Sequence, residues 1–281
     1  MRARADLHIH SSVSDGVHSP TRIVELALMR NLGGIALTDH DTIDGLSEFL
    51  AADAGENLVR IPGIEISSEY GGREAHIIGY FVDPYSKSLK SKLTWVEDAR
   101  RVRFPKLIEK LRELGIEITD NDVDDALNGV TSPGRPHAAR MLVRKGVVKD
   151  VNEAFEQFLK KGKPAYVRRD RLSAKDAVLL LKEEGAVPVL AHPLQLKVPD
   201  LRGVIIDLMN SGLAGIEVRY DYGTPHEGSE EELRSIAEAL GLIMTGGSDY
   251  HGDGTNNEIG TVTVPIETID ELRVAAHNPV G

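Results

Sequence analysis

The stretch DLHIHS, residues 6–11, decides how the rest of the chain is interpreted, because it places two histidines in a short apolar run. Successive side chains of a strand point to opposite faces, so His8 and His10 point the same way. Two imidazoles at this spacing can bind one metal ion together. The same spacing is compatible with buried histidines that hydrogen-bond within a core, so both interpretations stay open at this point.

Composition limits the classes of protein that the chain can belong to. Its 281 residues suffice for two average domains or one larger α/β barrel. We find no run of about 18 apolar residues and no apolar secretory segment after the first arginines, and we therefore expect a cytoplasmic protein that does not span a membrane. There is no cysteine, so a bound metal ion would be held by His, Asp and Glu.

Charge is distributed unevenly along the chain. The net charge of -11 argues against a general nucleic-acid coat, but residues 98–171 carry 17 Lys and Arg against 12 Asp and Glu. Such a segment fits either a module that meets an anionic substrate or a solvated helical surface. The basic runs ARRVRFPK (99–106) and VRRDR (167–171) are therefore either a track for oligonucleotide phosphates or ordinary surface.

Apolar runs of strand length alternate with segments of helical spacing over most of the chain. This alternation, with short connections, indicates βα units and a parallel sheet or barrel. The predicted strands are 5–9, 33–39, 58–67, 74–82, 186–192, 213–220 and 241–249, and the predicted helices are 19–31, 173–185, 201–212 and 229–241.

The middle of the chain breaks this rhythm. No strand is indicated between 87 and 166, and four segments there have helical spacing: 95–115, 119–128, 134–146 and 150–162. The sequence therefore predicts a discontinuous α/β barrel, residues 1–86 and 167–281, interrupted by an all-helical insert domain at 87–166.

Residue types that bind metals recur at the predicted strands. In parallel barrels, catalytic groups gather at the C-terminal ends of the strands. A common metal site explains this recurrence better than several independent core histidines. Asp39, Asp41 and Asp44 fit turns or carboxylates that orient His40, and Asp15 fits a turn residue. We expect His18, His226 and His277 at the surface. The candidate ligands after DLHIHS are His40, Glu65, His76, His192, Asp249 and His251.

Eight motifs together resemble the polymerase and histidinol phosphatase (PHP) family of metal-dependent phosphoesterases, and its TrpH-like branch in particular. They cover nearly the whole chain and occur in the order of that family. The insert motif GRPHAAR is especially characteristic of the branch. The motifs are DLHIHSSVSDG (6–16), ALTDHDT (36–42), PGIEIS (62–67), HIIGY (76–80), GRPHAAR (134–140), AFEQFLKKGKPAYV (154–167), VLAHP (189–193) and GGSDYHG (246–252).

The resemblance implies a distorted (β/α)7 barrel with three divalent metal ions at its mouth. Manganese is favoured, with Fe2+, Zn2+ or Mg2+ as alternatives. Polymerase-associated relatives often have His where this chain has Asp15, and a harder oxygen ligand suits Mn2+, Mg2+ or iron. The implied ligand sets are His8, His10, Glu65 and Asp249 for the first ion, Glu65, His76 and His192 for the second, and Asp15, His40 and His251 for the third.

The same resemblance implies hydrolysis of phosphate esters by a hydroxide that bridges two ions, because metal binding lowers the pKa of water to about 7 in favourable cases. Arg135 is the cation expected at the phosphoryl oxygens, since its planar fork matches phosphate; a salt bridge that anchors the insert is the alternative. His137 would bind phosphate or protonate the leaving oxygen, and Arg219 is a second candidate for substrate binding. The expected catalytic set is Arg135, His137, Asp249 and His192.

TrpH-like relatives act on phosphomonoesters of nucleotides such as 3',5'-bisphosphates or AMP, and some trim short RNA from the 5' end. The expected substrate is therefore a nucleotide or short oligonucleotide, with phosphate as product; the sequence indicates no obligate protein partner. A histidinol-phosphate phosphatase, a non-catalytic metal-binding module and an amidohydrolase-type barrel are the alternatives. The last usually carries a metal-bridging lysine, and no Lys lies at the corresponding strand ends.

Overall fold

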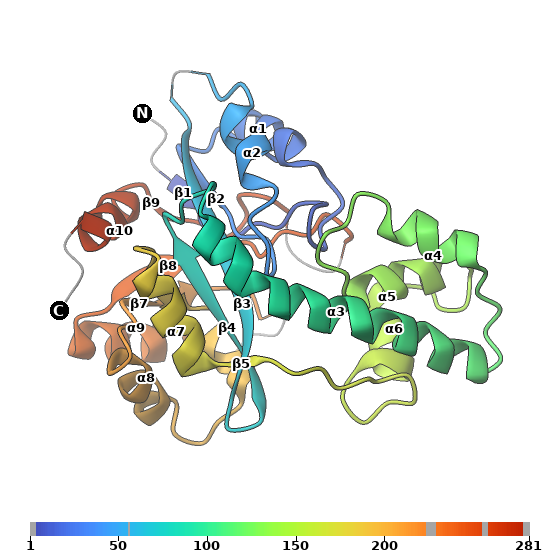
Figure 1. The fold of residues 1–281 in the computed structure, drawn as a ribbon. Helices are drawn as coiled ribbons and strands as arrows, with labels where there is room; N and C mark the ends of the chain where they lie inside the picture. The colour runs from blue at the N-terminus through green and yellow to red at the C-terminus, as the bar shows by residue number, and fades with distance from the viewer. Residues whose placement is uncertain (1–3, 56, 223–228, 255–257, 278–281) are drawn as a thin grey trace.

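A computed structural model describes residues 4–55, 57–222, 229–254 and 258–277. A single sheet in the order β8-β7-β6-β4-β3-β2-β1-β9 curves into a barrel, with β5 added on β3 (Figure 1). The seven predicted strands are all present. The strands are β1 (Arg4–Asp6), β2 (Gly34–Leu37), β3 (Val59–Tyr70), β4 (Arg73–Tyr80), β5 (Leu172–Ser173), β6 (Val187–Leu190), β7 (Gly215–Arg219), β8 (Ile243–Gly246) and β9 (Val264–Pro265).

The barrel closes at the DLHIHS stretch. Just beyond β1, the Leu7 N–H donates to the Gly246 carbonyl (3.2 Å) and the His10 N–H donates to the Tyr250 carbonyl (2.9 Å). A Cβ at Gly247 would lie 2.4 Å from the backbone nitrogen of His8, so this close approach requires glycine. The first and last parts of the barrel therefore meet at the two histidines.

The prediction of parallel strands is wrong at one place. β4 pairs antiparallel with both β3 and β6, whereas the β1–β2, β2–β3, β6–β7 and β7–β8 pairs are parallel. The physical reason is the connection between β3 and β4, where Gly71 (φ 56°) and Gly72 (φ 76°) form a tight hairpin turn. A parallel pair needs a much longer crossover. The predicted distorted barrel with a helical insert is otherwise confirmed.

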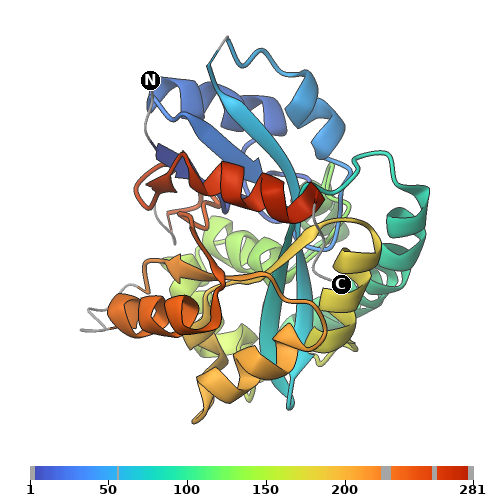
Figure 2. The same ribbon diagram turned by 90° about the vertical axis from the view of Figure 1, so that its left-hand side faces the viewer.

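Helices cover the outside of the barrel (Figure 2). α1 begins after Ser19, whose side chain accepts a hydrogen bond from the Arg22 N–H, and it buries Ile23, Val24 and Ala27. The sequence did not predict α2, α10 or the 3-10 turn η2. No described helix is long and apolar enough to cross a membrane. These helices are α1 (Pro20–Met29), α2 (Leu46–Ala51), α7 (Ala174–Glu183), α8 (Leu201–Met209), α9 (Ser229–Leu240) and α10 (Thr268–His277), with η2 at Pro193–Leu196.

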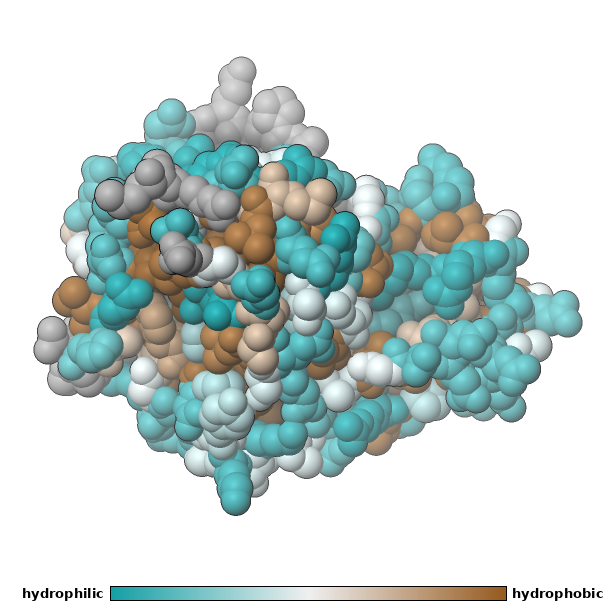
Figure 3. Space-filling model, turned by 90° about the horizontal axis from the view of Figure 1, so that it is seen from above, coloured by the Kyte–Doolittle hydropathy of each residue, from teal (hydrophilic) through white to brown (hydrophobic). Residues whose placement is uncertain are grey.

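The insert forms a helical lobe at one side of the barrel, and its surface is mostly hydrophilic on the face seen in Figure 3. It has a hydrophobic cluster of its own, which includes Phe104, Leu107 and Met141. Leu89 and Leu93, in the first turns of α3, pack into the barrel core instead. The domain boundary at residue 87 therefore stays a prediction, because one helix is shared. The insert elements are α3 (Lys87–Glu113), α4 (Asp120–Leu127), α5 (Arg135–Arg144), α6 (Val151–Ala154) and the π-helical turn η1 (Phe155–Leu159).

Candidate metal centre

The fold brings all nine predicted ligands into one cluster, which we call the nine-residue cluster. Seven of its members follow strands, in agreement with the expected position at strand ends. Glu65 and His76 differ, because they lie within β3 and β4, where they are diagonal neighbours across the antiparallel hairpin and contact each other. The members are His8, His10, Asp15, His40, Glu65, His76, His192, Asp249 and His251.

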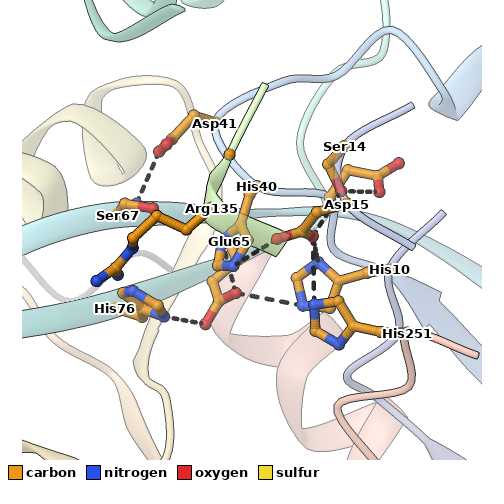
Figure 4. A network of polar contacts seen from close by, with 12 residues as sticks. His10, Ser14, Asp15, His40, Asp41, Glu65, Ser67, His76, Arg135 and His251 are labelled. Carbon is orange, nitrogen blue, oxygen red and sulfur yellow. Dashed lines mark hydrogen bonds and ion pairs between the residues drawn. The ribbon is translucent and has the colours of Figure 1, made fainter. Parts of the chain in front are cut away.

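Glu65 lies at the centre of the cluster, and its two carboxylate oxygens contact different histidines (Figure 4). It is buried, and the part of β3 that carries it lies between the loop after β2 and strand β4. Its Oε2 lies 3.5 Å from Nε2 of His8, 3.3 Å from Nε2 of His10 and 2.9 Å from Nδ1 of His40, and its Oε1 lies 2.9 Å from Nδ1 of His76 and 3.1 Å from Nε2 of His192.

Two aspartates complete the cluster on either side of His10. Oδ1 of Asp249 lies 3.1 Å from Nε2 of His10 and 3.3 Å from Nε2 of His8. Oδ1 of Asp15 lies 3.2 Å from Nε2 of His251 and 3.8 Å from Nδ1 of His10. Asp15, which the sequence left as a turn residue until the resemblance was considered, therefore lies in the cluster.

Several buried polar atoms of the cluster have no hydrogen-bond partner. Burying such atoms without a partner is unfavourable. Imidazole nitrogens and carboxylate oxygens are the ligands that divalent metals use in the absence of cysteine, so these atoms fit bound cations. The unpartnered atoms are Nε2 of His8, both ring nitrogens of His10, Nδ1 of His40, Oε2 of Glu65 and Nε2 of His76.

Three groups of ligand atoms lie close enough for one ion each. The group of His8, His10 and Asp249 agrees with the first implied set except that Glu65 is absent, and the group with Asp15 agrees with the third set except that His10 joins it. In the remaining group His40 takes the place expected for His192, although His192 also contacts Glu65. The groups are His8, His10 and Asp249; His40, Glu65 and His76; and His10, Asp15, His40 and His251.

Electrostatics favour the metal-binding form of the carboxylates. Burial would raise the pKa of the Glu65 carboxyl, but His40, His76 and His8 hold it well below its usual range. Burial likewise opposes the ionised Asp15, and His40 and His251 still hold the pKa of its carboxyl well below the ordinary value. Both carboxylates are therefore charged at neutral pH.

The backbone at two ligands is unusual. His192 (φ 27°) and Asp249 (φ 51°) have positive φ, which is uncommon for residues other than glycine. They follow β6 and β8, and the turns aim their side chains back over the barrel mouth. Such strain persists where the surrounding structure fixes a functional side chain.

Sequence reasoning missed Glu217, a buried carboxylate that contacts two ligands. Its Oε1 lies 3.0 Å from Nδ1 of His8, and its Oε2 accepts a hydrogen bond from the His192 N–H (2.8 Å). Glu217 thereby leaves Nε2 of His8 directed at the cluster. The signal was available, because an acidic residue inside the apolar run LAGIEV indicates a buried carboxylate.

Tyr220 was missed as well. Its hydroxyl donates to Oδ2 of Asp249 (2.9 Å) and accepts from Nε2 of Gln195 (2.9 Å). Burial and the carboxylate of Asp249 raise the pKa of Tyr220, so the phenol stays protonated and orients Asp249. No sequence pattern pointed to this tyrosine.

Arg219 lies away from the nine-residue cluster. Its guanidinium donates to the carbonyl of Thr263 (2.7 Å) and lies 3.7 Å from Glu230, at the surface. A register shift between Glu217 and Arg219 turns this end of β7 outward. In this structure Arg219 therefore contacts neither the cluster nor the cavity beside it, and its role in substrate binding stays an untested prediction.

Arg135 begins α5, and both interpretations of it have support. Its guanidinium lies 3.3 Å from Glu74 of β4, and this ion pair anchors the insert to the barrel. The guanidinium also lies over the ring of Phe155 within the insert. It also lines a cavity that includes His76 and His192 of the cluster. The position of Arg135 is therefore compatible with contact to a substrate at the cluster.

His137 is buried at the start of α5, where its Nδ1 accepts a hydrogen bond from the Gly134 N–H (3.0 Å). Burial and the nearby Arg140 lower the pKa of His137 to about 4. The imidazole is therefore neutral near pH 7, and its Nδ1 is already used by the helix start. Any contact of His137 with substrate would involve Nε2.

The other histidines and aspartates considered from the sequence have separate surroundings. His18 is half-buried, with Nδ1 2.9 Å from the Tyr250 hydroxyl, and His277 is exposed. His226 lies outside the described residues. Asp39 accepts hydrogen bonds from Ser11 and Ser14, and Asp44 contacts Lys90. Asp41 pairs with Arg100 and Arg169.

The cavity beside the cluster has a volume of about 760 Å³ and is strongly basic. His76 and His192 form the wall nearest the cluster, and Glu69 and Glu74 are its acidic residues. A cavity of this size and charge fits an anionic small molecule. Its basic residues are Arg73, Arg135, Lys160, Lys161, Arg168, Arg171 and Lys197.

Comparison with known proteins identifies the class. The family model for the PHP domain matches residues 6–119. A 3',5'-nucleoside bisphosphate phosphatase from Chromobacterium violaceum is 33% identical over 90% of this chain and 88% of its own length. A 5'-3' exoribonuclease from Haemophilus influenzae is 32% identical over 89% of this chain and 91% of its own length.

Solved structures agree with the sequence comparison. A protein from Bifidobacterium adolescentis, described as a metal-dependent phosphoesterase, superposes with a TM-score of 0.88, at 30% identity over 96% of this chain and 95% of its own. The chain therefore belongs to the PHP family of metal-dependent phosphoesterases, as its motifs indicated. It is a phosphoric ester hydrolase.

Proposed function

We propose that the chain removes a phosphate group from a nucleotide at the nine-residue cluster. The observation that carries this proposal is the basic cavity, which shares His76 and His192 with the cluster. A substrate in the cavity would place one phosphate at the cluster and the rest of the molecule among cationic side chains. Two relatives named for nucleotide and RNA substrates support this choice.

The cluster would hold three divalent ions, with Mn2+ favoured and Fe2+, Zn2+ or Mg2+ as alternatives, in the ligand sets that the resemblance implies. When bound, the ions activate water near neutral pH and neutralise charge on the phosphoryl oxygens. The donor set supports hard or intermediate metals, since it has oxygen and imidazole ligands and no sulfur. Glu217 and Tyr220 orient His8 and Asp249 towards the ions.

The other site residues act on the substrate itself. Arg135 binds phosphoryl oxygens, and Glu74 holds its guanidinium in place until the substrate arrives. His137 is neutral, so it contributes a hydrogen bond from Nε2 to the phosphate or to the leaving oxygen. His192 and Asp249, by contrast, would act through the metal ions that they hold.

Nucleoside 3',5'-bisphosphates or AMP are the proposed substrates. Exonuclease activity on short RNA from the 5' end is the second candidate, because the basic lining of the cavity extends from Arg135 to Lys160, Lys161 and Lys197. Phosphate is released in the first case. The cytoplasmic location expected from the sequence stays a prediction.

A substrate panel with each metal in turn tests the proposal. We expect adenosine 3',5'-bisphosphate or 5'-phosphorylated RNA to be turned over much faster than histidinol phosphate. Release of orthophosphate without shortening of RNA favours the phosphatase, and a product ladder shortening from the 5' end favours the exonuclease. Faster turnover of histidinol phosphate would overturn the proposal.

Asp249→Asn separates a catalyst from a metal-binding module. We expect this variant to lose metal content and turnover together. Asp270→Asn is a matched control, because Asp270 is exposed and pairs only with Arg273 in the described structure. Retained turnover in the Asp249→Asn protein would contradict the assignment of the cluster.

A further inference from the structure

The two basic runs of the sequence come together at the seam between the insert and the barrel. Arg100 and Arg103 belong to α3, and Arg169 and Arg171 lie in the segment that returns to the barrel. We call these four the seam arginines. The interpretation of the runs as ordinary surface is wrong for them, because all four side chains are buried; Arg103 is only 6% exposed.

Positive charge exceeds negative charge at this seam. In the described structure, the ion pairs of the seam arginines involve only two carboxylates, although the chain has many acidic residues. Asp41, in the loop after β2, forms ion pairs with Arg100 and Arg169. Glu74 of β4 forms ion pairs with Arg171 and with Arg135. The pairs are Arg100–Asp41 (2.6 Å), Arg169–Asp41 (3.2 Å), Arg171–Glu74 (2.8 Å) and Arg135–Glu74 (3.3 Å).

Arg103 has no counterion. Within the described part of the chain, its guanidinium makes no hydrogen bond and no ion pair. Its nitrogens are not sealed from solvent, whereas Nε of Arg169 and Nε of Arg171 are sealed and have no acceptor. Among the described residues, three of the four seam arginines therefore carry N–H donors without an acceptor, and those of Arg103 are open to solvent.

An unpaired buried guanidinium among like charges is costly. Burial, together with the charges of Arg169, Arg135 and Arg100, lowers the pKa of Arg103 well below its usual range. A bound anion would remove this cost, because it supplies both the missing charge and the missing acceptors. Arginine forks match the oxygens of a phosphate group in particular.

The position of the seam connects it to the proposed reaction. Arg171 and Arg135 line the same cavity as His76 and His192. Arg103 does not line this cavity itself, but the charges of Arg135 and Arg171, which do, act on it, so a substrate with two phosphates would reach both the seam and the cluster. This arrangement distinguishes a substrate with two phosphates from one with a single phosphate.

We propose that Arg103, with Arg169 and Arg171, binds a second phosphate group of the substrate, one that is not cleaved. This assignment rests on the proposed function, since it places the cleaved phosphate at the nine-residue cluster. It makes Arg103 a residue that determines specificity, and it assigns the two basic runs to one phosphate group instead of a long oligonucleotide track.

Kinetics of Arg103→Gln test the specificity. We expect the ratio of kcat/KM for adenosine 3',5'-bisphosphate to that for adenosine 3'-monophosphate to fall at least tenfold, mainly through KM for the bisphosphate. Arg101→Gln is the matched control on the same helix, because Arg101 is 58% exposed and lies 3.9 Å from Glu97 at the surface. An unchanged ratio in the Arg103→Gln enzyme would overturn the proposal.

Anion binding by metal-free protein provides a test that does not depend on turnover. We expect sodium sulfate to raise the melting temperature of the parent protein more than sodium chloride of equal ionic strength does, and we expect Arg103→Gln to reduce this difference while Arg101→Gln retains it. Without sulfate, Arg103→Gln should melt no lower than the parent, because it removes an unpaired charge. An equal sulfate response in both variants, or a large loss of stability in Arg103→Gln alone, would show a structural arginine instead. Failure of the parent protein to hydrolyse any nucleotide would contradict the proposed function and leave this anion test intact.

Discussion

Asp41 holds the insert against the barrel, and its neutralisation should be costly. The buried Asp41 carboxylate accepts a hydrogen bond from the Ser67 N–H (2.7 Å) and pairs with Arg100 (2.6 Å) and Arg169 (3.2 Å). Asp41→Asn keeps the shape and an acceptor oxygen. Asn also tolerates the positive φ of 57° at this position, so the change removes the charge and one of the two accepting oxygens while the backbone is kept.

The size of the effect follows from the burial of the ion pairs. Removing one partner of a buried pair typically costs about 3–5 kcal/mol, because the other charge stays buried and unpaired. For a chain of this size, about 1 kcal/mol lowers the melting temperature by about 2–4 °C, so the expected loss is roughly 6–20 °C. Two arginines lose their counterion here, which places the expectation towards the upper end.

Asp44→Asn is the matched control. Asp44 lies three residues further on and pairs with the exposed Lys90 at the surface. Such a pair contributes about 0–1 kcal/mol. Thermal and urea denaturation of both variants at pH 7 measure the difference, and equal losses below about 1 kcal/mol in both would refute the reasoning.

The pH dependence gives a second check of Asp41. Burial opposes its charge, but Arg100 and Arg169 hold the pKa of Asp41 below its usual range. A depressed pKa contributes stability that is complete above the pKa of the unfolded chain, about 3.9, and is lost as the pH falls further. The stability gap between the parent and Asp41→Asn should therefore be constant near neutral pH and narrow below about pH 4.

Two further predictions concern the metal centre. Burial would lower the pKa of His76, but Glu65 and Glu74 raise it to about 9, so metal must displace a proton from His76 at neutral pH. Calorimetry of metal-free protein should show tighter Mn2+ binding at pH 8 than at pH 6, with proton release; equal affinities would contradict this. Glu217→Gln should weaken metal binding about 10- to 100-fold through the loss of its contact with His8, and unchanged metal content after dialysis would count against that role.

The sequence predicted the barrel because its strands are short apolar runs with clear boundaries. The antiparallel β4 was not predicted, because the run at 74–82 has the same composition as its parallel neighbours. The direction of β4 is decided by Gly71 and Gly72, which close a hairpin too short for a crossover. α2 was missed since it is only six residues long, without a side-chain cap.

The structure brings the nine predicted ligand residues together, and their binding of metal stays a prediction. Eight of them have residue types that are unusual at apolar strands, whereas Asp15 was identified only by the resemblance. The burial of Arg103 could not be predicted from the sequence. Its surroundings are made by two segments more than 60 residues apart, so no local pattern separates it from the exposed Arg101.

The central position of Glu65 limits how the enzyme can change. One of its oxygens faces His8, His10 and His40, and the other faces His76 and His192. In the proposed metal centre, any adjustment of this carboxylate that suits one ion would alter the coordination of its neighbour. Metal preference should therefore shift for the whole centre at once, so adaptation to a different metal supply would proceed through the surrounding residues while this glutamate is retained.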